Sequence, residues 1–212
     1  MRQGDDNATQ MLTAALVLAN VAVFALELSQ GDNVESLVRR WGLVPADLAD
    51  SPAVLVTLLT GTFLHAGWLH LLSNLLYLAV FGPPVERKVG SLRFGLLYAA
   101  SALGGSLAHV LAQPLSTQPA VGASGAVAGI IAAHLVLFPN ATLGSVSPVL
   151  FLPVIENAPV LPLLLVWLGA QVLAGLASLT STTGIAWSAH LGGFALGLMM
   201  AFMLRGRRVR RT

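Results

Sequence analysis

Long apolar runs separated by short polar links constrain this chain more than any other feature. A membrane-spanning helix needs roughly 20 apolar residues, and six runs approach or reach that length: 11–28, 68–83, 92–113, 122–138, 159–179 and 186–204. Of the 212 residues, 56% are hydrophobic and only 9% are charged, whereas a soluble domain is about 25% charged. The sequence therefore predicts an all-α membrane protein with a single six-span domain over 1–212.

The connections between the runs are unequal. The first connection, 29–67, is long, with charges early and the amphipathic stretch "AVLVTLLTGTFLHAGW" later. It is too polar and broken to span, so we expect short helices at the membrane interface. No charged region and A-x-A site precede the first run, so no cleaved signal peptide is expected. The chain has no cysteine, which excludes disulfides and thiol chemistry.

Positive charges predict the orientation. The tail 205–212 carries five arginines, and Arg87, Lys88 and Arg93 follow the second run. Both clusters should be cytoplasmic, although 29–67 carries Arg39 and Arg40 against the rule. Six spans then place both termini in the cytoplasm, in a multi-pass protein of the cell (inner) membrane with a first extracytoplasmic loop. A basic cluster beside a span points to anionic lipid, and no nucleic-acid partner is expected.

Four polar residues fall at a similar depth in this topology. His70 and Asn74 begin the second run, Ser124 begins the fourth, and His190 lies a few residues into the sixth. His70 and Asn74 are four residues apart and share a helix face. Polar groups inside a membrane are costly and tend to face one another or a water-filled cavity. Their common depth on three helices predicts one site.

Small residues predict how two of these helices meet. Gly125 and Gly129 in the fourth run, and Gly193 and Gly197 in the sixth, have the four-residue spacing that lets helix backbones approach closely. If those faces pack together, a serine on one helix and a histidine on the other come within hydrogen-bond reach. A serine beside a histidine is the minimum for nucleophilic catalysis, because the imidazole accepts the hydroxyl proton during attack.

The candidate site would be a dyad rather than a triad. Asp and Glu are absent from the outer halves of the second, fourth and sixth runs. Acyl transfer also needs hydrogen-bond donors for the developing oxyanion. The Asn74 amide, the His70 ring and the free backbone N–H groups where the fourth run begins at Ser124 could supply them.

These residues resemble the rhomboid family of intramembrane serine proteases. The resemblance covers about 52–205 and rests on the motifs "HAGWLHLLSN" (65–74), "VGASG" (121–125) and "AHLGGFALG" (189–197), with "FGPPVERKVGSLRF" (81–94) similar to the family's turn between spans two and three. It implies a rhomboid-like six-helix bundle. The roles it implies are nucleophile for Ser124, general base for His190, and oxyanion hole for His70, Asn74 and the Ser124 N–H.

The resemblance also implies a substrate class, and this chain departs from the family pattern at two places. The substrates would be transmembrane helices of other membrane proteins, cut near the extracytoplasmic face after a small residue, with no metal or cofactor. Some family members carry an aromatic residue one turn after the serine, packed on the histidine, where this chain has Ala128. Trp187 or helix packing would then hold His190. A Trp-Arg pair of the first connection is replaced by Val56-Thr57.

Two other function classes stay open. An inactive rhomboid-like protein would bind transmembrane helices without cutting them, but it would typically lack the serine and histidine. A channel or small transporter should show internal repeats or charges at the midplane, and neither is found.

The remaining polar and aromatic residues have simpler interpretations. By composition, Glu86 with Arg87 and Lys88 is a solvated turn, whereas the resemblance implies that Glu86 pins that turn. An interfacial position is expected for seven aromatic side chains: His65, His109, His134, Trp41, Trp68, Trp167 and Trp187.

Overall fold

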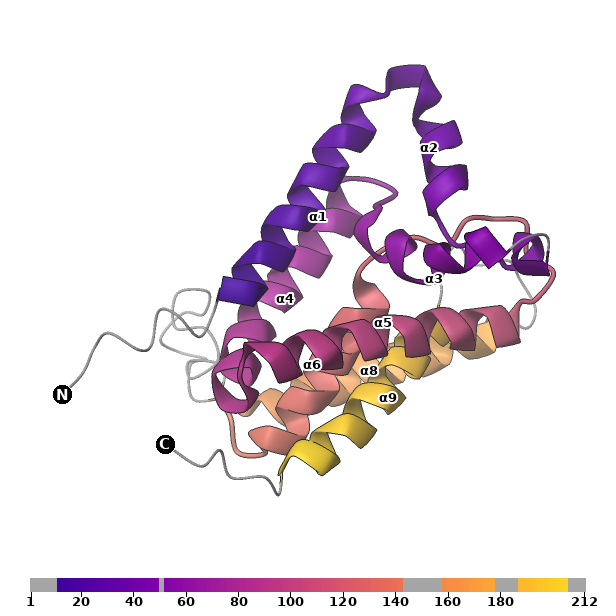
Figure 1. Ribbon diagram of the computed structural model, residues 1–212. Helices are drawn as coiled ribbons and strands as arrows, with labels where there is room; N and C mark the ends of the chain where they lie inside the picture. Colours follow the sequence, from indigo (N-terminus) through magenta and orange to yellow (C-terminus); the bar gives the residue numbers. More distant parts are fainter. Residues whose placement is uncertain (1–10, 50–51, 143–157, 178–186, 206–212) are drawn as a thin grey trace.

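The computed structural model describes residues 11–49, 52–142, 158–177 and 187–205, and within them the fold is helical. A helix occupies each of the six apolar runs (Figure 1): α1 (Met11–Ser29), α4 (Trp68–Val89), α5 (Ser91–Ala112), α6 (Ser124–Leu137), α8 (Val160–Ala177) and α9 (Trp187–Arg205). The predicted all-α class is therefore confirmed in the described part of the chain. The predicted tail after Arg205 lies outside the described residues.

Four of the described helices are long and apolar enough to cross a membrane, namely α1, α4, α5 and α9. With 14 residues, α6 rises only about 21 Å, less than the roughly 30 Å of a bilayer core. The apolar stretch Val160–Gly169 of α8 is also shorter than a span. The chain is thus a multi-pass membrane protein with four candidate spans, and the count of six stays a prediction.

The helix that contains the predicted second span, about 68–83, extends beyond that span. Helix α4 continues to Val89 through Pro83 and Pro84, although each proline removes a backbone hydrogen bond. Burial holds the extra turns in place, because Val85 and Val89 are packed against the core. The charged residues 86–88 consequently belong to the last turn of α4 rather than to a link.

Contacts between side chains give the helix directions. Near one end of the bundle the ring of His70 lies against Gly122, and toward the other end the rings of Phe81 and His134 are 5.0 Å apart, so α4 and α6 run in parallel. The start of α1 contacts Glu86 at the end of α4, and Phe24 in the second half of α1 packs on Trp68 at the start of α4. Therefore α1 is antiparallel to α4.

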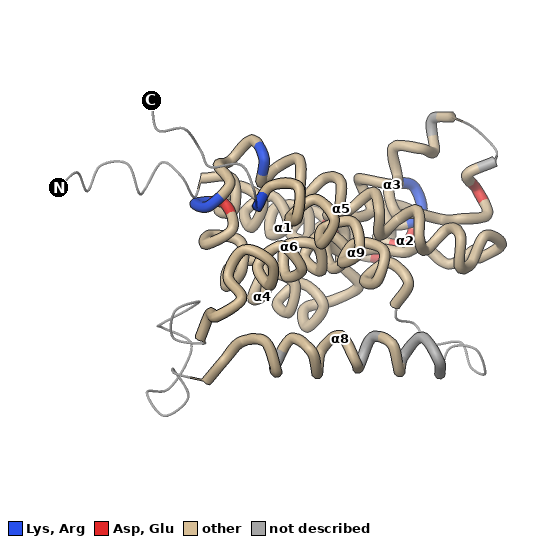
Figure 2. The backbone as a smooth tube through the Cα atoms, turned by 90° about the horizontal axis from the view of Figure 1, so that it is seen from below, with Lys and Arg blue, Asp and Glu red and all other residues tan. Residues whose placement is uncertain are grey.

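Two ends of the bundle can now be distinguished. We call the end where α4 and α6 finish and α1 and α5 start the basic end, and the opposite end the site end. Figure 2 shows Lys and Arg at the basic end beside the α4–α5 turn and, at the site end, on the first connection. The helices between are almost free of charge in the described residues, as expected for segments that face lipid.

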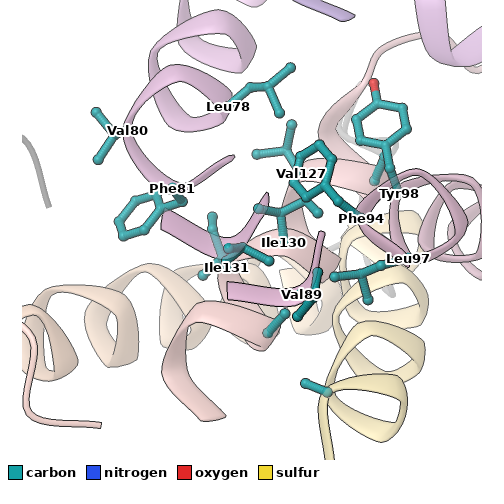
Figure 3. Close-up of a cluster of buried hydrophobic side chains, with 14 of the residues drawn as sticks. Leu78, Val80, Phe81, Val89, Phe94, Leu97, Tyr98, Val127, Ile130 and Ile131 are labelled. Carbon is teal, nitrogen blue, oxygen red and sulfur yellow. The ribbon is translucent and has the colours of Figure 1, made fainter. Parts of the chain in front are cut away.

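The core lies between α4, α5 and α6. Leu78 and Phe81 of α4, Phe94 and Leu97 of α5, and Ile130 of α6 are buried and converge in Figure 3. Helix α6 contributes the most completely buried surface, with most of its side chains shielded by neighbouring helices. It is therefore the central helix, and a residue at its start is held on several sides.

The first connection forms short helices, as predicted. It contains α2 (Val34–Trp41), α3 (Thr57–Thr60) and the 3₁₀ turns Gly31–Asn33, Pro45–Ala49, Pro52–Val56 and Gly61–Phe63. Leu43 and Ala120 exchange two backbone hydrogen bonds of 3.0 and 2.7 Å. This bridge ties the first connection to the loop that precedes α6.

Glu86 is not solvated, contrary to its compositional interpretation. It is fully buried, and its carboxylate accepts hydrogen bonds from Leu12 N, Thr13 N, Thr13 Oγ1 and Ser91 Oγ. The first N–H groups of a helix have no intrahelical acceptor, and Glu86 supplies one for the start of α1. One side chain of α4 thus fixes the starts of α1 and α5.

Candidate active site

Ser124 is the first residue of α6. The backbone just before it is held by the Leu43–Ala120 bridge and by a 2.9 Å hydrogen bond from Gly122 N to Gly61 O. Gly122 has a φ of 121°, a conformation that side-chain-bearing residues rarely adopt. The glycine therefore allows the turn that presents Ser124 at a helix N-terminus, where free N–H groups point outward.

The hydroxyl of Ser124 meets the ring of His190. The Nε2 atom of His190 lies 2.8 Å from the Oγ atom of Ser124, within the ordinary range for such a hydrogen bond. His190 lies in the first turn of α9, and the two residues are 66 positions apart. With Nε2 as acceptor, the imidazole can take the hydroxyl proton.

Glycines bring α6 and α9 close enough for this contact. A methyl group on Gly193 would collide with the carbonyl of Gly125, and one on Gly197 would collide with the backbone of Gly129. The two backbones therefore touch over two successive turns. Ser124 is the residue directly before Gly125, the first of these contacts, so the close packing of the two helices also sets the distance from Ser124 to α9.

His70 and Asn74 line the same space from α4. A Cβ atom on Gly122 would lie 2.5 Å from the His70 Nε2 atom and 3.7 Å from the Asn74 Nδ2 atom. Asn74 Nδ2 donates to the His70 carbonyl at 3.0 Å, which leaves its second N–H available. Ser73 Oγ donates to the same carbonyl at 2.9 Å. These bonds order the first turns of α4 beside Ser124.

An open cavity of about 410 Å³ connects these side chains. Its lining residues come from the end of the first connection, from α4, from the loop before α6, and from α6, α8 and α9, and include His70, Asn74, Tyr77, Ser124, Trp167 and His190. A volume of this size falls in the range of ligand sites. Apolar walls with a few polar groups that point to one place suit an apolar peptide segment that presents one peptide bond to those groups.

Trp167 packs against the candidate base. The Trp167 and His190 ring centroids are 6.2 Å apart with a 37° tilt. The indole thus approaches the imidazole from α8, and the expectation that Trp187 or helix packing holds His190 stays a prediction. Since Ala128 is fully buried and offers no ring there, Trp167 provides the aromatic contact from a different helix.

His65 is buried inside the protein. Its ring lies 5.2 Å from the His70 ring, and its backbone N–H donates to both carboxylate oxygens of Glu27 at 3.1 and 3.2 Å. Burial, together with the nearby His70, lowers the pKa of His65 to about 4. The ring is therefore neutral near pH 7, and it places no charge beside His70.

His109 also lies inside the protein. It is buried, and its Nδ1 atom is 3.3 Å from Ser188 Oγ. Next to it, a small cavity of about 40 Å³ reaches Ser124 and is lined by polar side chains of Thr62, Ser106 and His109. Polar walls and this volume suffice for water, the second reactant in any hydrolysis.

The structure brings all four predicted polar residues to one place. Ser124, His190, His70 and Asn74 surround one cavity, and the four predicted glycines lie at the α6–α9 contact. Sequence reasoning missed Trp167 and Gly122. Gly122 could have been found inside "VGASG", whereas nothing local marks Trp167. In the described part of the chain, no group of three or more His, Cys, Asp or Glu is arranged to hold a metal ion.

Comparison with known proteins agrees with this arrangement. The rhomboid domain profile matches residues 52–207. The putative rhomboid protease YdcA of Bacillus subtilis is 30% identical over 156 residues, which cover 73% of this chain and 69% of YdcA. RHOMBOID-like protein 4 of Arabidopsis thaliana is 37% identical over 148 residues, 69% of this chain and 33% of the plant protein. The chain belongs to the rhomboid family.

The relatives differ in length and in stated activity. The chain spans 33% of RHOMBOID-like protein 4 and 53% of RHOMBOID-like protein 6 from Arabidopsis. The inactive rhomboid protein 1 of Drosophila melanogaster is 31% identical over 114 residues, 54% of this chain and 8% of the fly protein. Family membership alone therefore does not decide between a protease and an inactive protein.

Proposed function

We propose that this protein is an intramembrane serine endopeptidase with a Ser124–His190 dyad. It hydrolyses a peptide bond in or next to the transmembrane helix of a membrane-protein substrate. The single observation that carries the proposal is the 2.8 Å distance between Ser124 Oγ and His190 Nε2 inside an open cavity. An inactive helix-binding protein would have no need of this pair.

The first half of the reaction forms an acyl-enzyme. Ser124 Oγ attacks the scissile carbonyl carbon while its proton moves to His190 Nε2. The carbonyl oxygen becomes an oxyanion, and the Ser124 N–H, the His70 ring and the free N–H of Asn74 surround the space where that charge develops. His190 then gives its proton to the leaving amine nitrogen, and the C–N bond breaks.

Water completes the reaction. A water molecule attacks the ester carbonyl and transfers a proton to His190, which returns it to Ser124 Oγ as the ester bond breaks. The small polar cavity beside Ser124 offers a place for that water. No metal or cofactor takes part in this scheme.

The substrate class follows from the surroundings of the cavity. Apolar side chains of α4, α6 and α8 line it, and a hydrocarbon-embedded helix can meet them without losing solvation. A helical peptide bond is shielded, so the substrate must unwind locally before attack. Small residues, which offer less side-chain bulk, suit the close approach of backbone to Ser124.

The orientation is part of the proposal. Arg87, Lys88 and Arg93 lie at the basic end, where α4 finishes and α5 starts. Gly193 meets Gly125 and Gly197 meets Gly129, so α9 runs parallel to α6 and Arg205 lies at the same end. By the positive-inside rule that end faces the cytoplasm. The start of α1 and the end of α9 would then be cytoplasmic, and the site would open toward the extracytoplasmic face of the cell (inner) membrane.

Reconstitution tests the proposal. Full-length protein in liposomes is mixed with a single-span substrate labelled at both ends, beside Ser124→Ala and His190→Ala variants. We expect cleavage by the wild type and a loss of at least about a thousandfold in each variant. Binding without cleavage by a folded wild type would instead assign an inactive helix-binding function.

A further inference from the structure

A second cavity lies at the basic end, away from Ser124. It has a volume of about 570 Å³ and opens between the last turns of α4 and the end of α6. Arg87, Lys88, Pro84, His134, Phe138 and Asn140 contribute to its lining. None of its lining residues borders the site cavity, so the proteolytic mechanism leaves this cavity without a role.

Two cations of this cavity are uncompensated. Arg87 and Lys88 are exposed on the last turn of α4, and neither has an ion pair or hydrogen bond with a described residue. Glu86 is the acid next to them, but its carboxylate already binds the start of α1 and Ser91. An anionic group entering the cavity would therefore meet a net positive charge.

A buried polar atom also lacks a partner here. His134 is 1% exposed, and its Nδ1 atom has no hydrogen bond within the described residues. Its ring is fixed between Phe81 and Phe138, with both centroid distances 5.0 Å. Buried polar atoms are normally paired. An oxygen ligand in the cavity would satisfy Nδ1 in the tautomer that carries its proton there.

The backbone at this cavity does not favour an anionic ligand, so side chains must attract it. Both α4 and α6 finish at the cavity, and the carbonyl end of a helix repels anions. Arg87 and Lys88 therefore have to overcome this repulsion themselves. Pro84, Phe138 and Pro139 give the remaining wall an apolar character, which suits a ligand that is anionic at one end and apolar at the other.

We propose that this cavity binds the phosphate group of an anionic phospholipid. Arg87 and Lys88 contact the phosphate oxygens, His134 Nδ1 donates one hydrogen bond from within, and Pro84 and Phe138 contact the glycerol and upper acyl carbons. Basic pockets between helices at a membrane boundary suit such headgroups. The proposal does not depend on the protein being a protease.

Native mass spectrometry of the full-length protein tests this site. The protein is released from nanodiscs that contain phosphatidylglycerol and phosphatidylcholine in equal amounts, and the retained lipid is identified by mass. We expect one tightly retained phosphatidylglycerol on the wild type. Each basic residue near a membrane contributes about a fivefold preference, so Arg87→Gln/Lys88→Gln should lose the preference by about tenfold or more.

A matched control removes the same charge at the same end. Arg93→Gln/Arg205→Gln lies outside the cavity lining and should retain the lipid. If the Arg87/Lys88 double variant does not fold, the single variants at these exposed positions decide, each with about a fivefold loss. No preference in the wild type, equal loss in the control, or retention in the double variant would overturn the proposal. In a separate arm, free phosphate is added to the protein. If the protein then carries phosphate adducts but retains no lipid, a phospholipid is not the ligand and the proposal is overturned.

Discussion

The indole ring of Trp167 faces the imidazole of His190 at a centroid distance of 6.2 Å. These residues come from α8 and α9, whereas position 128 of α6 carries an alanine and offers no aromatic group. An aromatic partner restricts the imidazole and excludes water from one of its faces. The aromatic support of the candidate base thus comes from α8.

Trp167→Ala should therefore slow acylation of Ser124. Such ring contacts contribute about 0.5–1.5 kcal/mol, so we expect a loss of up to about tenfold in the rate of labelling by a small serine-reactive probe. Trp167→Phe should retain most of that rate. The small probe is used because Trp167 also lines the site cavity. With a helix substrate, the measured rate would combine the effect of Trp167 on His190 with its effect on substrate binding. An unchanged probe rate in Trp167→Ala would show that the indole does not position His190.

Gly122→Ala should damage the oxyanion site. The new methyl group would lie 2.5 Å from the His70 ring, which must then move away from the cavity. Losing one oxyanion donor costs about a hundredfold to a thousandfold in kcat, and we expect a loss in kcat of that size with the fold retained. Gly31→Ala is the control, because Gly31 also has a positive φ but nothing within 4 Å of a Cβ atom. Equal kcat losses in the two variants would point to backbone strain instead of the His70 contact.

Gly197→Ala should destabilise the bundle. Its methyl group would meet the backbone of Gly129, and backbone cannot move aside as a side chain can. Overpacking typically costs 1–3 kcal/mol, and we expect the free energy of unfolding in detergent to fall by about 2 kcal/mol or more. Gly169→Ala on α8 meets nothing within 4 Å and should be neutral or slightly stabilising. A neutral Gly197→Ala would contradict the close α6–α9 contact.

Glu86→Gln should loosen the start of α1. The carboxylate accepts four hydrogen bonds from donors, and an amide turns one of the two accepting atoms into a donor. An unmatched buried polar group costs about 1–3 kcal/mol, so the free energy of unfolding should fall by that amount, measured by thermal unfolding in detergent. Exposed Glu35 of α2 offers the control Glu35→Gln, which should change stability by less than about 0.5 kcal/mol. Similar shifts for both variants would rule out the anchoring role of Glu86.

The helices were predictable because their apolar runs have the length that a bilayer demands. The start of α6 and the start of α9 could be placed at one depth by counting residues, and the glycine spacing predicted a close approach of the two helices. Ser124 and His190 indeed lie within hydrogen-bond distance. Their catalytic roles stay predictions, because proximity allows proton transfer without demonstrating it.

Long-range packing was not predictable from local patterns. Trp167 has the appearance of an interface anchor, and only the position of α8 turns it toward His190. Glu86 is followed by Arg87 and Lys88 in the sequence, yet the start of α1 covers it. His109 and His134 are buried, and each contacts a residue of another helix, Ser188 and Phe81 respectively. In each of these cases the deciding partner is far away in the sequence.

The reactivity of Ser124 is the central claim and can be measured directly. Purified protein is treated with a fluorophosphonate probe, and the labelled residue is located by peptide mass spectrometry, beside Ser124→Ala and His190→Ala. The account predicts one label on Ser124 in the wild type and none in either variant. A folded wild type that stays unlabelled, or a label on Ser124 that survives His190→Ala, would contradict the dyad.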